Sequence, residues 1–402
     1  MTDSTYDLSP DVFQRREHHE VFALMRANDP VYKHTDADGA TYWCLTKHAD
    51  VQRANRDTET FTVTNGFTLL DFETNPLEAS MMGEMLPGMA DERHTQYRRI
   101  VNRGFTPKTL RLIEDHLTLK ATRIVDGVID RGSCEFVEEV AARLPLEAIC
   151  ELVGVPAEDS KRVFEWGNAM TGIDDPNLGD MDAGMHASAE LIAYADELRQ
   201  RRVTDPQDDI ITKLTQAGDA GESLTEMELG MFFLLLVVAG NETTRNATAH
   251  GMRALLENPD QLAKLQADPS REAIELAVEE ILRWSSPLLY FRRTATKDVD
   301  LRGKTIKQGD WVVLWYASAN RDEEVFDDPF QFDVTRTPND HVTFGGGGPH
   351  FCLGANLARM ELRLIFTELV TRMSGLRLDG EVEMLRSNFV GGVLRMPIAW
   401  TP

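Results

Sequence analysis

The chain has 402 residues, of which 27% are charged, and its formal net charge at pH 7 is −24. A charge of this sign repels nucleic-acid phosphates and argues against polynucleotide binding, while the length leaves ample volume to enclose a cofactor. The four cysteines are widely spaced and form no C-x-x-C or C-x-x-C-H pattern, which argues against a zinc ribbon, covalent c-type haem attachment and a disulfide framework.

The N-terminal residues MTDSTYDLSP are acidic and polar, where a signal peptide carries positive charge and then an apolar core. The longest apolar stretch, residues 231–239, is nine residues long, well short of the roughly 20 that cross a bilayer. We therefore expect a cytoplasmic protein without a membrane anchor.

Strand-like segments lie towards the two ends of the chain, and helical periodicity dominates the middle. The expected strands are residues 31–33, 41–45, 299–301, 311–315 and 393–398. The sequence thus predicts a mainly α (α+β) fold in one domain, residues 1–402. We expect a helical core at about 90–290 and 352–372, and a smaller β-rich part at about 30–65, 290–316 and 376–400.

Residues 62–90 are rich in Met, Leu and Phe and show no clean periodicity. Such a segment is too apolar for a solvated connector. Long loops of this kind usually bind ligands, and methionines adapt to irregular shapes. A core-packing irregular segment explains the composition equally well, so both interpretations stay open.

His94 and Arg98 stand four residues apart in an expected helix, so both project from one side of it. Two neighbouring cations favour an anionic ligand. A solvated basic face is the alternative interpretation.

Residues 231–245 read MFFLLLVVAGNETTR, an apolar helix with polar groups where the pattern predicts burial. Buried polar groups need a partner or a function. Gly240 lacks a side chain and could leave room for a small ligand, and a threonine hydroxyl can bond back to a helix carbonyl and loosen the helix locally, opening a groove for water. A helix with a few back-bonded threonines is the simpler alternative.

Two further motifs follow. Glu280 and Arg283 place opposite charges at i and i+3 within an apolar stretch, which predicts a buried ion pair but carries little weight alone. Residues 319–329 read ANRDEEVFDDP.

Residues 344–354 read FGGGGPHFCLG and run into a helical pattern. Glycines allow close backbone approach and expose N–H groups, and a helix N-terminus favours a thiolate over a thiol. Cys352 is therefore a candidate thiolate ligand for a large flat group such as haem. An inert cysteine beside a tight turn is the alternative for any isolated cysteine.

Taken in order, these motifs resemble those of the cytochromes P450. The cysteine segment is similar to F-x-x-G-x-H/R-x-C-x-G with one additional glycine, a longer loop found in some lipid-oxidising bacterial members. AGNETT at residues 239–244 resembles A-G-x-D/E-T-T, residues 280–283 resemble E-x-x-R, and residues 319–329 resemble A-N-R-D-x-x-x-F-x-x-P.

The resemblance implies heme b with Cys352 as its axial metal ligand. Thr243 would hydrogen-bond the activated dioxygen and Glu242 would relay protons. His94, Arg98, Arg293 and His350 match propionate partners, and Glu280 with Arg283 would lock the core. The remaining expected haem-binding positions are Ala239, Gly240, Phe344, Gly345 and Gly354.

The resemblance also implies a monooxygenase that uses O2 and takes electrons from a ferredoxin and its reductase, and we expect a monomer. Bacterial members with similar motifs suggest a hydrophobic substrate, either a steroid, a terpenoid or a branched lipid; an aromatic hydrocarbon or a macrolide precursor is the alternative. The expected pocket residues are Leu69, Leu70, Met81, Met82, Leu86, Leu235, Val238, Leu288, Leu289, Phe291, Phe389 and Val390.

Two other classes stay open. One is a haem-thiolate enzyme that uses peroxide or does not oxygenate, and the other is a haem sensor or carrier. The intact pair of Glu242 and Thr243 argues against both, because a proton relay for O2 activation serves neither.

Overall fold

A computed structural model describes residues 5–69, 83–170, 181–216 and 224–402. The chain forms two compact units. The first, here the sheet unit, consists of Met1–Asp91, Glu279–Cys352 and Met384–Gly392, and the second, the helical unit, of Glu92–Val278, Leu353–Glu383 and Val393–Pro402. Because each unit draws on three separate stretches of chain, neither corresponds to one contiguous segment. The single domain expected from the sequence stays a prediction.

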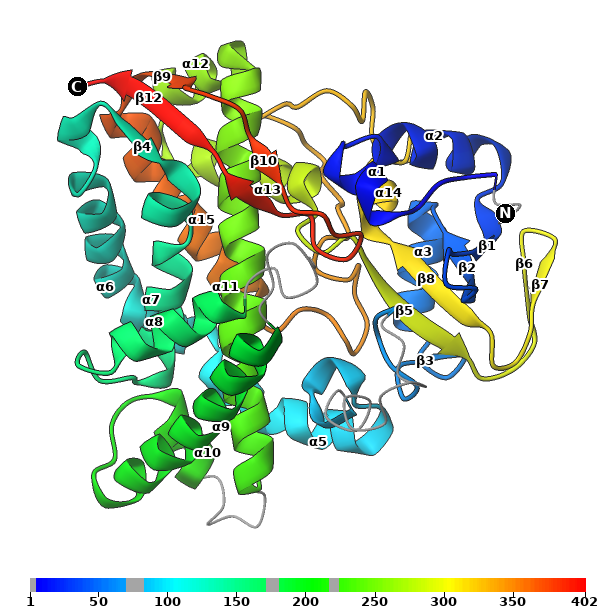
Figure 1. Ribbon diagram of the computed structural model, residues 1–402, viewed down its shortest axis with the longest axis horizontal. Helices are drawn as coiled ribbons and strands as arrows, with labels where there is room; N and C mark the ends of the chain where they lie inside the picture. Colours follow the sequence, from blue (N-terminus) through cyan, green and yellow to red (C-terminus); the bar gives the residue numbers. More distant parts are fainter. Residues whose placement is uncertain (1–4, 70–82, 171–180, 217–223) are drawn as a thin grey trace. The chain divides into compact units, whose positions relative to one another are not determined.

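The sheet unit is built on five strands in the order β1-β2-β8-β5-β3 (Figure 1). β2 and β8 run parallel, with Tyr42 opposite Trp311, and the other pairs are antiparallel. The strands are β1 (Val31–Thr35), β2 (Thr41–Leu45), β3 (Phe61–Thr62), β5 (Tyr290–Ala295) and β8 (Trp311–Trp315). The hairpin of β6 (Val299–Leu301) and β7 (Lys304–Ile306) also belongs to this unit. Strand β10 (Glu383–Met384) stands where the chain passes from the helical unit into the sheet unit. The predicted strands at 41–45, 299–301 and 311–315 are confirmed.

The central strand β8 is buried on both faces, which explains its continuous apolar run. Val312 and Leu314 belong to one core cluster with residues of α3, whereas Val313 and Trp315 belong to a second cluster with residues of α1 and α2. Successive side chains of a strand point to opposite faces, so helices on both sides demand apolar residues at every position. The helices of this unit are α1 (Pro10–Gln14), α2 (His18–Asn28), α3 (His48–Arg56), η1 (Leu86–Gly88) and α14 (Tyr316–Ala319).

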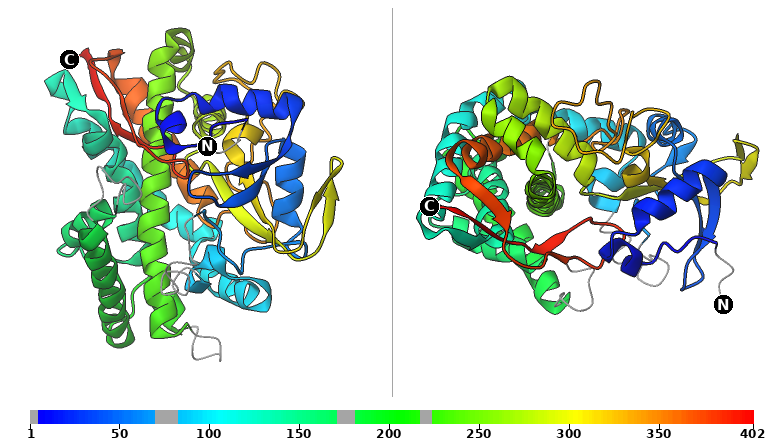
Figure 2. Two further views of the ribbon diagram at one scale, coloured as in Figure 1. Left: turned by 45° about the vertical axis from the view of Figure 1, so that its right-hand side comes forward. Right: turned by 90° about the horizontal axis from the view of Figure 1, so that it is seen from above.

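The helical unit is organised around α11 (Glu226–Glu257), which is 32 residues long. Thr225 caps it in a capping box with Glu228, which satisfies backbone N–H groups at its start. Figure 1 shows α6, α7 and α8 along its left side, and the right-hand view of Figure 2 looks down its axis. Among the described helices it is the one long and apolar enough to cross a membrane, but half of its most apolar window is buried, as in a core helix.

The remaining helices run mostly through this unit, as the predicted helical range of 90–290 requires. They are α5 (Asp91–Val101), η2 (Asn102–Gly104), α6 (Pro107–Asp126), η3 (Ile129–Arg131), the π-helical η4 (Val137–Ala141), α7 (Arg143–Val153), α8 (Ser160–Ala169), α9 (Met181–Thr204), α10 (Ile210–Gln216), α12 (Pro259–Ala267), α13 (Arg271–Ser285) and α15 (Ala355–Arg372). α13 begins in the helical unit, and its residues from Glu279 belong to the sheet unit.

The predicted strand at 393–398 is two strands, β11 (Val393–Arg395) and β12 (Pro397–Thr401). Pro397 has no N–H to donate, and Met396 between them bonds elsewhere, its N–H to a carboxylate oxygen of Glu135 at 2.7 Å. β12 lies between β4 (Ser133–Glu135) and β9 (Ser374–Leu378). β4 interrupts the range predicted to be helical, since its pairing partner lies far away in the sequence.

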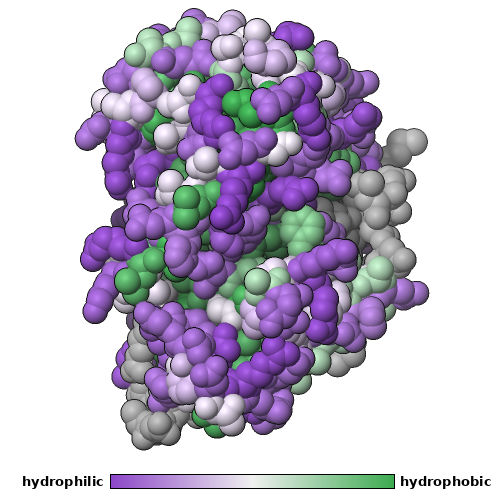
Figure 3. Space-filling view, turned by 90° about the vertical axis from the view of Figure 1, so that its left-hand side faces the viewer, coloured by the Kyte–Doolittle hydropathy of each residue, from purple (hydrophilic) through white to green (hydrophobic). Residues whose placement is uncertain are grey.

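Hydrophilic side chains cover most of the face of the molecule in Figure 3. Large hydrophobic side chains that are exposed in the helical unit, such as Leu112, Leu119 and Met185, come from different positions on α6 and α9. Scattered apolar side chains are normal on a folded protein.

Candidate functional site

The glycine-rich loop before Cys352 adopts a backbone that side chains rarely permit. Gly345, Gly346, Gly347 and Gly348 have φ values of 97°, 63°, 103° and 85°. A Cβ on Gly348 would lie 2.6 Å from the carbonyl oxygen of Asn55 at the end of α3. Four successive glycines are therefore needed both for the left-handed turns and for the close approach of the loop to α3.

The loop closes on itself at the cysteine. The Cys352 N–H donates to the carbonyl oxygen of Phe344 at 3.0 Å, and the rings of Phe344 and Phe351 lie 6.2 Å apart. Phe344 and His350 are half-buried, and a Cβ on Gly345 would meet the His350 carbonyl at 3.6 Å. Gly354 is the N-cap of α15, which begins three positions after Cys352, as expected.

The four cysteines divide sharply by environment. Cys44, Cys134 and Cys150 are buried, and burial raises the pKa of each thiol to about 12. Cys352 alone is exposed. Because a metal ligand must be a thiolate, Cys352 is the cysteine whose surroundings suit that role.

Arg293 on β5 is a fully buried cation without a carboxylate partner among the described residues. Its Nη1 donates to the Arg292 carbonyl and its Nη2 to the Asn55 side-chain oxygen, both at 2.9 Å, while Nε has no partner there. Burial lowers the pKa of this guanidinium. An uncompensated buried cation is costly, so the site favours an anionic ligand such as a haem propionate.

No sequence motif marks Asn55, which accepts a bond from Arg293. Its side-chain oxygen also accepts from the Tyr316 hydroxyl at 3.1 Å, and it lies on α3, 238 positions away from Arg293 in the sequence. Only the fold brings these residues together, since nothing in the local pattern of α3 marks Asn55.

His94 lies on α5 in the helical unit and differs from its predicted charge. It is 3% exposed, and burial together with the charge of Arg98 lowers its pKa to about 4. This neutral His94 differs from the expectation of two neighbouring cations. A neutral imidazole can still donate one N–H to an anion.

Thr243 bonds back along α11, as expected. Its hydroxyl donates to the Ala239 carbonyl oxygen at 2.7 Å. Leu235, Ala239 and Thr243 lie four residues apart and are partly or fully exposed, whereas most of α11 is buried. α11 is helical throughout, so this bond does not interrupt it. One face of the core helix thus presents apolar groups and a hydroxyl, as a ligand-facing surface would.

Gly240 lies close to α7. A Cβ there would lie 2.9 Å from the Ile149 side chain of α7. The glycine therefore allows α7 to pack closely against α11. That it also makes room for a small ligand stays a prediction.

The carboxylate of Glu242 is held by two neighbours on α11. Arg245 Nη2 donates to Oε2 at 2.5 Å, and Asn246 Nδ2 donates to Oε1 at 3.0 Å. Asn246 in turn accepts a bond from the Val393 N–H at 3.2 Å. Arg245 and Asn246 were not predicted as site residues, although they stand at i+3 and i+4 from an acidic residue, a spacing that favours such contacts.

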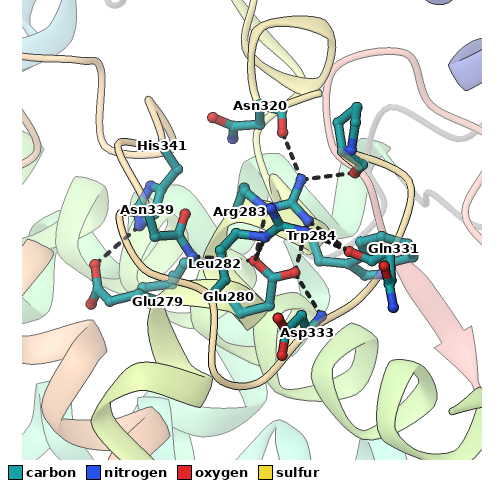
Figure 4. Close-up of polar contacts among 12 residues, drawn as sticks. Glu279, Glu280, Leu282, Arg283, Trp284, Asn320, Gln331, Asp333, Asn339 and His341 are labelled. Carbon is teal, nitrogen blue, oxygen red and sulfur yellow. Dashed lines mark hydrogen bonds and ion pairs between the residues drawn. The ribbon is translucent and has the colours of Figure 1, made fainter. Parts of the chain in front are cut away.

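The predicted ion pair of Glu280 and Arg283 is present and fully buried (Figure 4). Two bonds of 2.7 Å join the guanidinium to the two carboxylate oxygens, and Arg336 reaches Glu280 at 3.1 Å. Arg283 also donates to backbone carbonyls of Asn320, Pro329 and Gln331. Removing one partner of such a pair costs about 3–5 kcal/mol, so this network stabilises the sheet unit.

Asn320, from the ANRD segment, ties the glycine-rich loop to the end of α13. Its amide nitrogen donates to the hydroxyls of Ser286 and Thr343, both at 2.9 Å, and its oxygen accepts from the Val342 N–H at 2.7 Å. All three bonds lie in the sheet unit. They fix the chain just before the glycines and so help to place Cys352.

The predicted pocket residues fall into several groups. In the sheet unit Leu288 bridges Val390, and the rings of Phe291 and Phe389 lie 6.0 Å apart. Leu289 packs in the core with residues of α2, and Leu69 and Phe389 pack against the same cluster. Leu69, Leu235 and Val238 are half-buried, and Leu86 is buried. The other three predicted positions, Leu70, Met81 and Met82, lie outside the described residues.

The comparisons with known proteins agree. The model of the cytochrome P450 family matches residues 160–396. A steroid C26-monooxygenase of Mycolicibacterium smegmatis is 41% identical over 391 residues, 95% of this chain and 90% of the relative. A methyl-branched lipid omega-hydroxylase of Mycobacterium tuberculosis is 44% identical over 367 residues, 90% and 85% of the two chains. A Mycobacterium marinum cytochrome P450 in complex with pseudoionone has a TM-score of 0.90 and 36% identity, covering 98% of each chain.

The chain therefore belongs to the cytochrome P450 family. It is a haem-thiolate monooxygenase, which binds haem through a cysteine and uses O2, a redox partner and a hydrophobic substrate. The residues present fit that cofactor: an exposed thiol follows a glycine loop, and the buried guanidinium of Arg293 lacks a carboxylate partner among the described residues.

Proposed function

We propose that this enzyme hydroxylates a steroid, a terpenoid or a branched lipid, with Cys352 as the thiolate ligand of heme b. Two relatives that are 41% and 44% identical to most of this chain are named for a steroid and for methyl-branched lipids. The observation that supports Cys352 as the ligand is its exposure, in contrast to the other three cysteines, which are buried.

Bound haem supplies reductive activation of O2: with two electrons and two protons, one oxygen atom enters a C–H bond and the other leaves as water. The chain contributes the rest. Cys352 provides an anionic ligand, and Arg293 and Arg98 provide positive charge for the propionates. His94, neutral in this structure, and His350 add hydrogen-bond donors.

The substrate surface is supported by the apolar groups that the structure describes. Phe291, Phe389 and Val390 lie together in the sheet unit, and Leu235 and Val238 lie on α11. None carries a charge, so these side chains favour an apolar ligand held by shape. A charged head group would need a partner elsewhere.

Thr243 and Glu242 would control protons. The Thr243 hydroxyl already has one acceptor in the Ala239 carbonyl, so its oxygen stays available to accept a further bond. Glu242 is the neighbouring group that can carry a proton. Together they would deliver protons in step with electron transfer and limit the release of hydrogen peroxide.

Electrons would come from a ferredoxin and its reductase, because the chain has no G-x-G-x-x-G motif in the context that a nicotinamide or flavin module requires. We place the enzyme in the cytoplasm as a monomer. The net charge of −24 means that an acidic ferredoxin would need a local basic patch for docking.

The substrate class is tested by spectral titration of the ferric holoenzyme with sterols, terpenes, branched fatty acids, aromatics and macrolides. The proposal expects high-spin conversion and hydroxylated product with one of the first three classes. Conversion with aromatics or macrolides alone would contradict it.

A second measurement separates monooxygenation from peroxide use. Product should form with NADH, ferredoxin and reductase, and much less with hydrogen peroxide. Turnover supported by peroxide alone would contradict the proton relay, and absence of turnover with either would favour a sensor or carrier.

A further inference from the structure

We propose that Arg245 and Asn246 are positioning residues that hold the Glu242 carboxylate in place for proton delivery, and that Asn246 links this carboxylate to the chain at Val393. The inference rests on the proposed role of Glu242. In the proposed function, Glu242 and Thr243 couple electron use to product formation. The inference adds Arg245 and Asn246 to the residues on which this coupling depends.

The geometry leaves little freedom to the carboxylate. Arg245 and Asn246 follow Glu242 at i+3 and i+4, so all three side chains lie on one face of α11. Each carboxylate oxygen accepts one N–H, Oε2 from Arg245 and Oε1 from Asn246. A carboxylate has about four lone pairs, so it can still exchange a proton while both donors stay bound.

Burial makes this contact stronger than an ordinary surface pair. The side chains of Arg245 and Glu242 are 8% and 15% exposed. Charge-assisted bonds shielded from water are strong and directional, unlike exposed pairs that contribute little. Within the helical unit the pair therefore restricts the rotamer of Glu242.

Asn246 extends the contact beyond α11. Its oxygen accepts from the Val393 N–H, which leaves its amide nitrogen to face Glu242 and so fixes the orientation of the amide. Val393 follows three residues after Val390, a predicted substrate contact. A shift of this segment on substrate binding would thus have a short route along the chain to Glu242.

The decisive test is a double-mutant cycle in the holoenzyme with Glu242→Gln, Arg245→Met and the double variant. The fraction of NADH electrons found in product rather than in hydrogen peroxide is measured with ferredoxin and reductase. We expect each single variant to lower this fraction several-fold, and Arg245→Met to add nothing in the Glu242→Gln background. Arg245→Lys should restore part of the loss.

A matched control lies on the same helix. Arg253 is likewise buried and pairs with Glu257 at i+4, 3.3 Å away. Arg253→Met should change thermal stability without changing coupling. If it lowers coupling as much as Arg245→Met does, the effect is a general one of α11 packing and the inference is wrong.

Thermal unfolding of the ferric protein provides a readout that does not depend on turnover. Removing one charge leaves the other buried and unpaired, so each single variant should unfold at a lower temperature than the parent protein. The double variant should lose less melting temperature than the sum of the two single losses. Strictly additive losses would contradict a direct interaction.

Asn246→Asp tests the second donor. The carboxylate introduced at position 246 can still accept from the Val393 N–H but can no longer donate to Glu242. Coupling should therefore fall, and the solvent isotope effect on product formation should change. Unchanged coupling would remove Asn246 from the proposal.

The outcomes distinguish the two levels of the account. A drop in Glu242→Gln with none in Arg245→Met overturns the inference alone. Unchanged coupling in Glu242→Gln overturns the proposed relay and, with it, the inference.

Discussion

Arg293 carries a buried positive charge that favours a bound anion. Its guanidinium is buried in the sheet unit, where its described partners are a backbone carbonyl and the neutral side chain of Asn55. The apoprotein therefore holds an uncompensated cation, and a propionate would relieve that cost when haem binds.

Arg293→Met should affect the two forms of the protein in opposite directions. We expect weaker haem retention, because the propionate loses its partner, but an apoprotein that is at least as stable, because a buried charge is gone. Haem-to-protein ratios and apoprotein melting temperatures check this, with exposed Arg377→Met as control. Full haem retention would contradict the assignment.

Thr243 is the residue at which proton control can be tested most simply. Thr243→Ala removes the hydroxyl from a partly exposed position, so packing and ligand affinity should change little. Electrons should be diverted to hydrogen peroxide, and Thr243→Ser should keep most of the coupling. Spectral titration and peroxide assays measure the two effects, and unchanged coupling would show that the proton route runs elsewhere.

Several site residues could be predicted at this scale because each carries its own chemical signal. Cys352 follows a run of glycines. Glu280 and Arg283 are opposite charges at i and i+3 within an apolar stretch. The charge of His94 could not be predicted, since it depends on burial. The contact that Gly240 makes with Ile149 and the bond from Asn55 to Arg293 depend on residues far away in the sequence.

Among the elements, the glycine-rich loop depends on α3 for its shape. Gly348 combines a φ of 85° with close approach to the Asn55 carbonyl, whereas Gly303, in the turn after β6, has a φ of 78° but no atom within 4 Å of a Cβ. The two positions separate backbone strain from steric contact.

Gly303→Ala should cost about 1–2 kcal/mol, the penalty of a left-handed alanine. Gly348→Ala should cost more and should also reduce haem binding, since the loop must move away from α3. Chemical denaturation and haem content measure both. Equal losses of stability with normal haem content would show that the contact does not constrain the loop.

α15 contains a buried acid that the site does not use. Glu361 is 3% exposed, its Oε2 has no partner among the described residues, and burial raises its pKa well above the usual range. The folded state thus binds a proton that the unfolded state releases above about pH 4.3. The contribution of Glu361 to the free energy of unfolding is fully present below that pH. It declines by about 1.4 kcal/mol per pH unit as the pH rises towards the pKa of the folded state.

Glu361→Gln resembles the protonated acid and should remove this decline. We expect its stability advantage over the parent protein to grow from pH 5 to pH 8. Denaturation curves at several pH values test this; a difference that does not vary with pH would contradict a raised pKa.

Strands and helices differ in how well the sequence predicts them. β8 is predictable because burial on both faces leaves an apolar run, and α11 because its pattern is long. β4 is not, since only its pairing with β12 makes Ser133–Glu135 a strand. The break between β11 and β12 could have been anticipated from Pro397.

At the scale of the whole molecule, both units contribute residues to the proposed activity. The sheet unit carries Cys352 and Arg293, and the helical unit carries Thr243 and Glu242. Because these residues come from distant stretches of the chain, no single segment indicates the function. The order of the motifs along the sequence does. The net charge of −24 bears on docking with a redox partner rather than on the chemistry.

The spectrum of the ferrous holoenzyme with carbon monoxide shows whether a thiolate coordinates the haem iron. Thiolate coordination by Cys352 predicts the long-wavelength Soret band that is characteristic of cytochromes P450, and its loss in Cys352→His with haem still bound. Absence of that band in freshly purified parent protein, or its persistence in Cys352→His, would contradict thiolate coordination by Cys352.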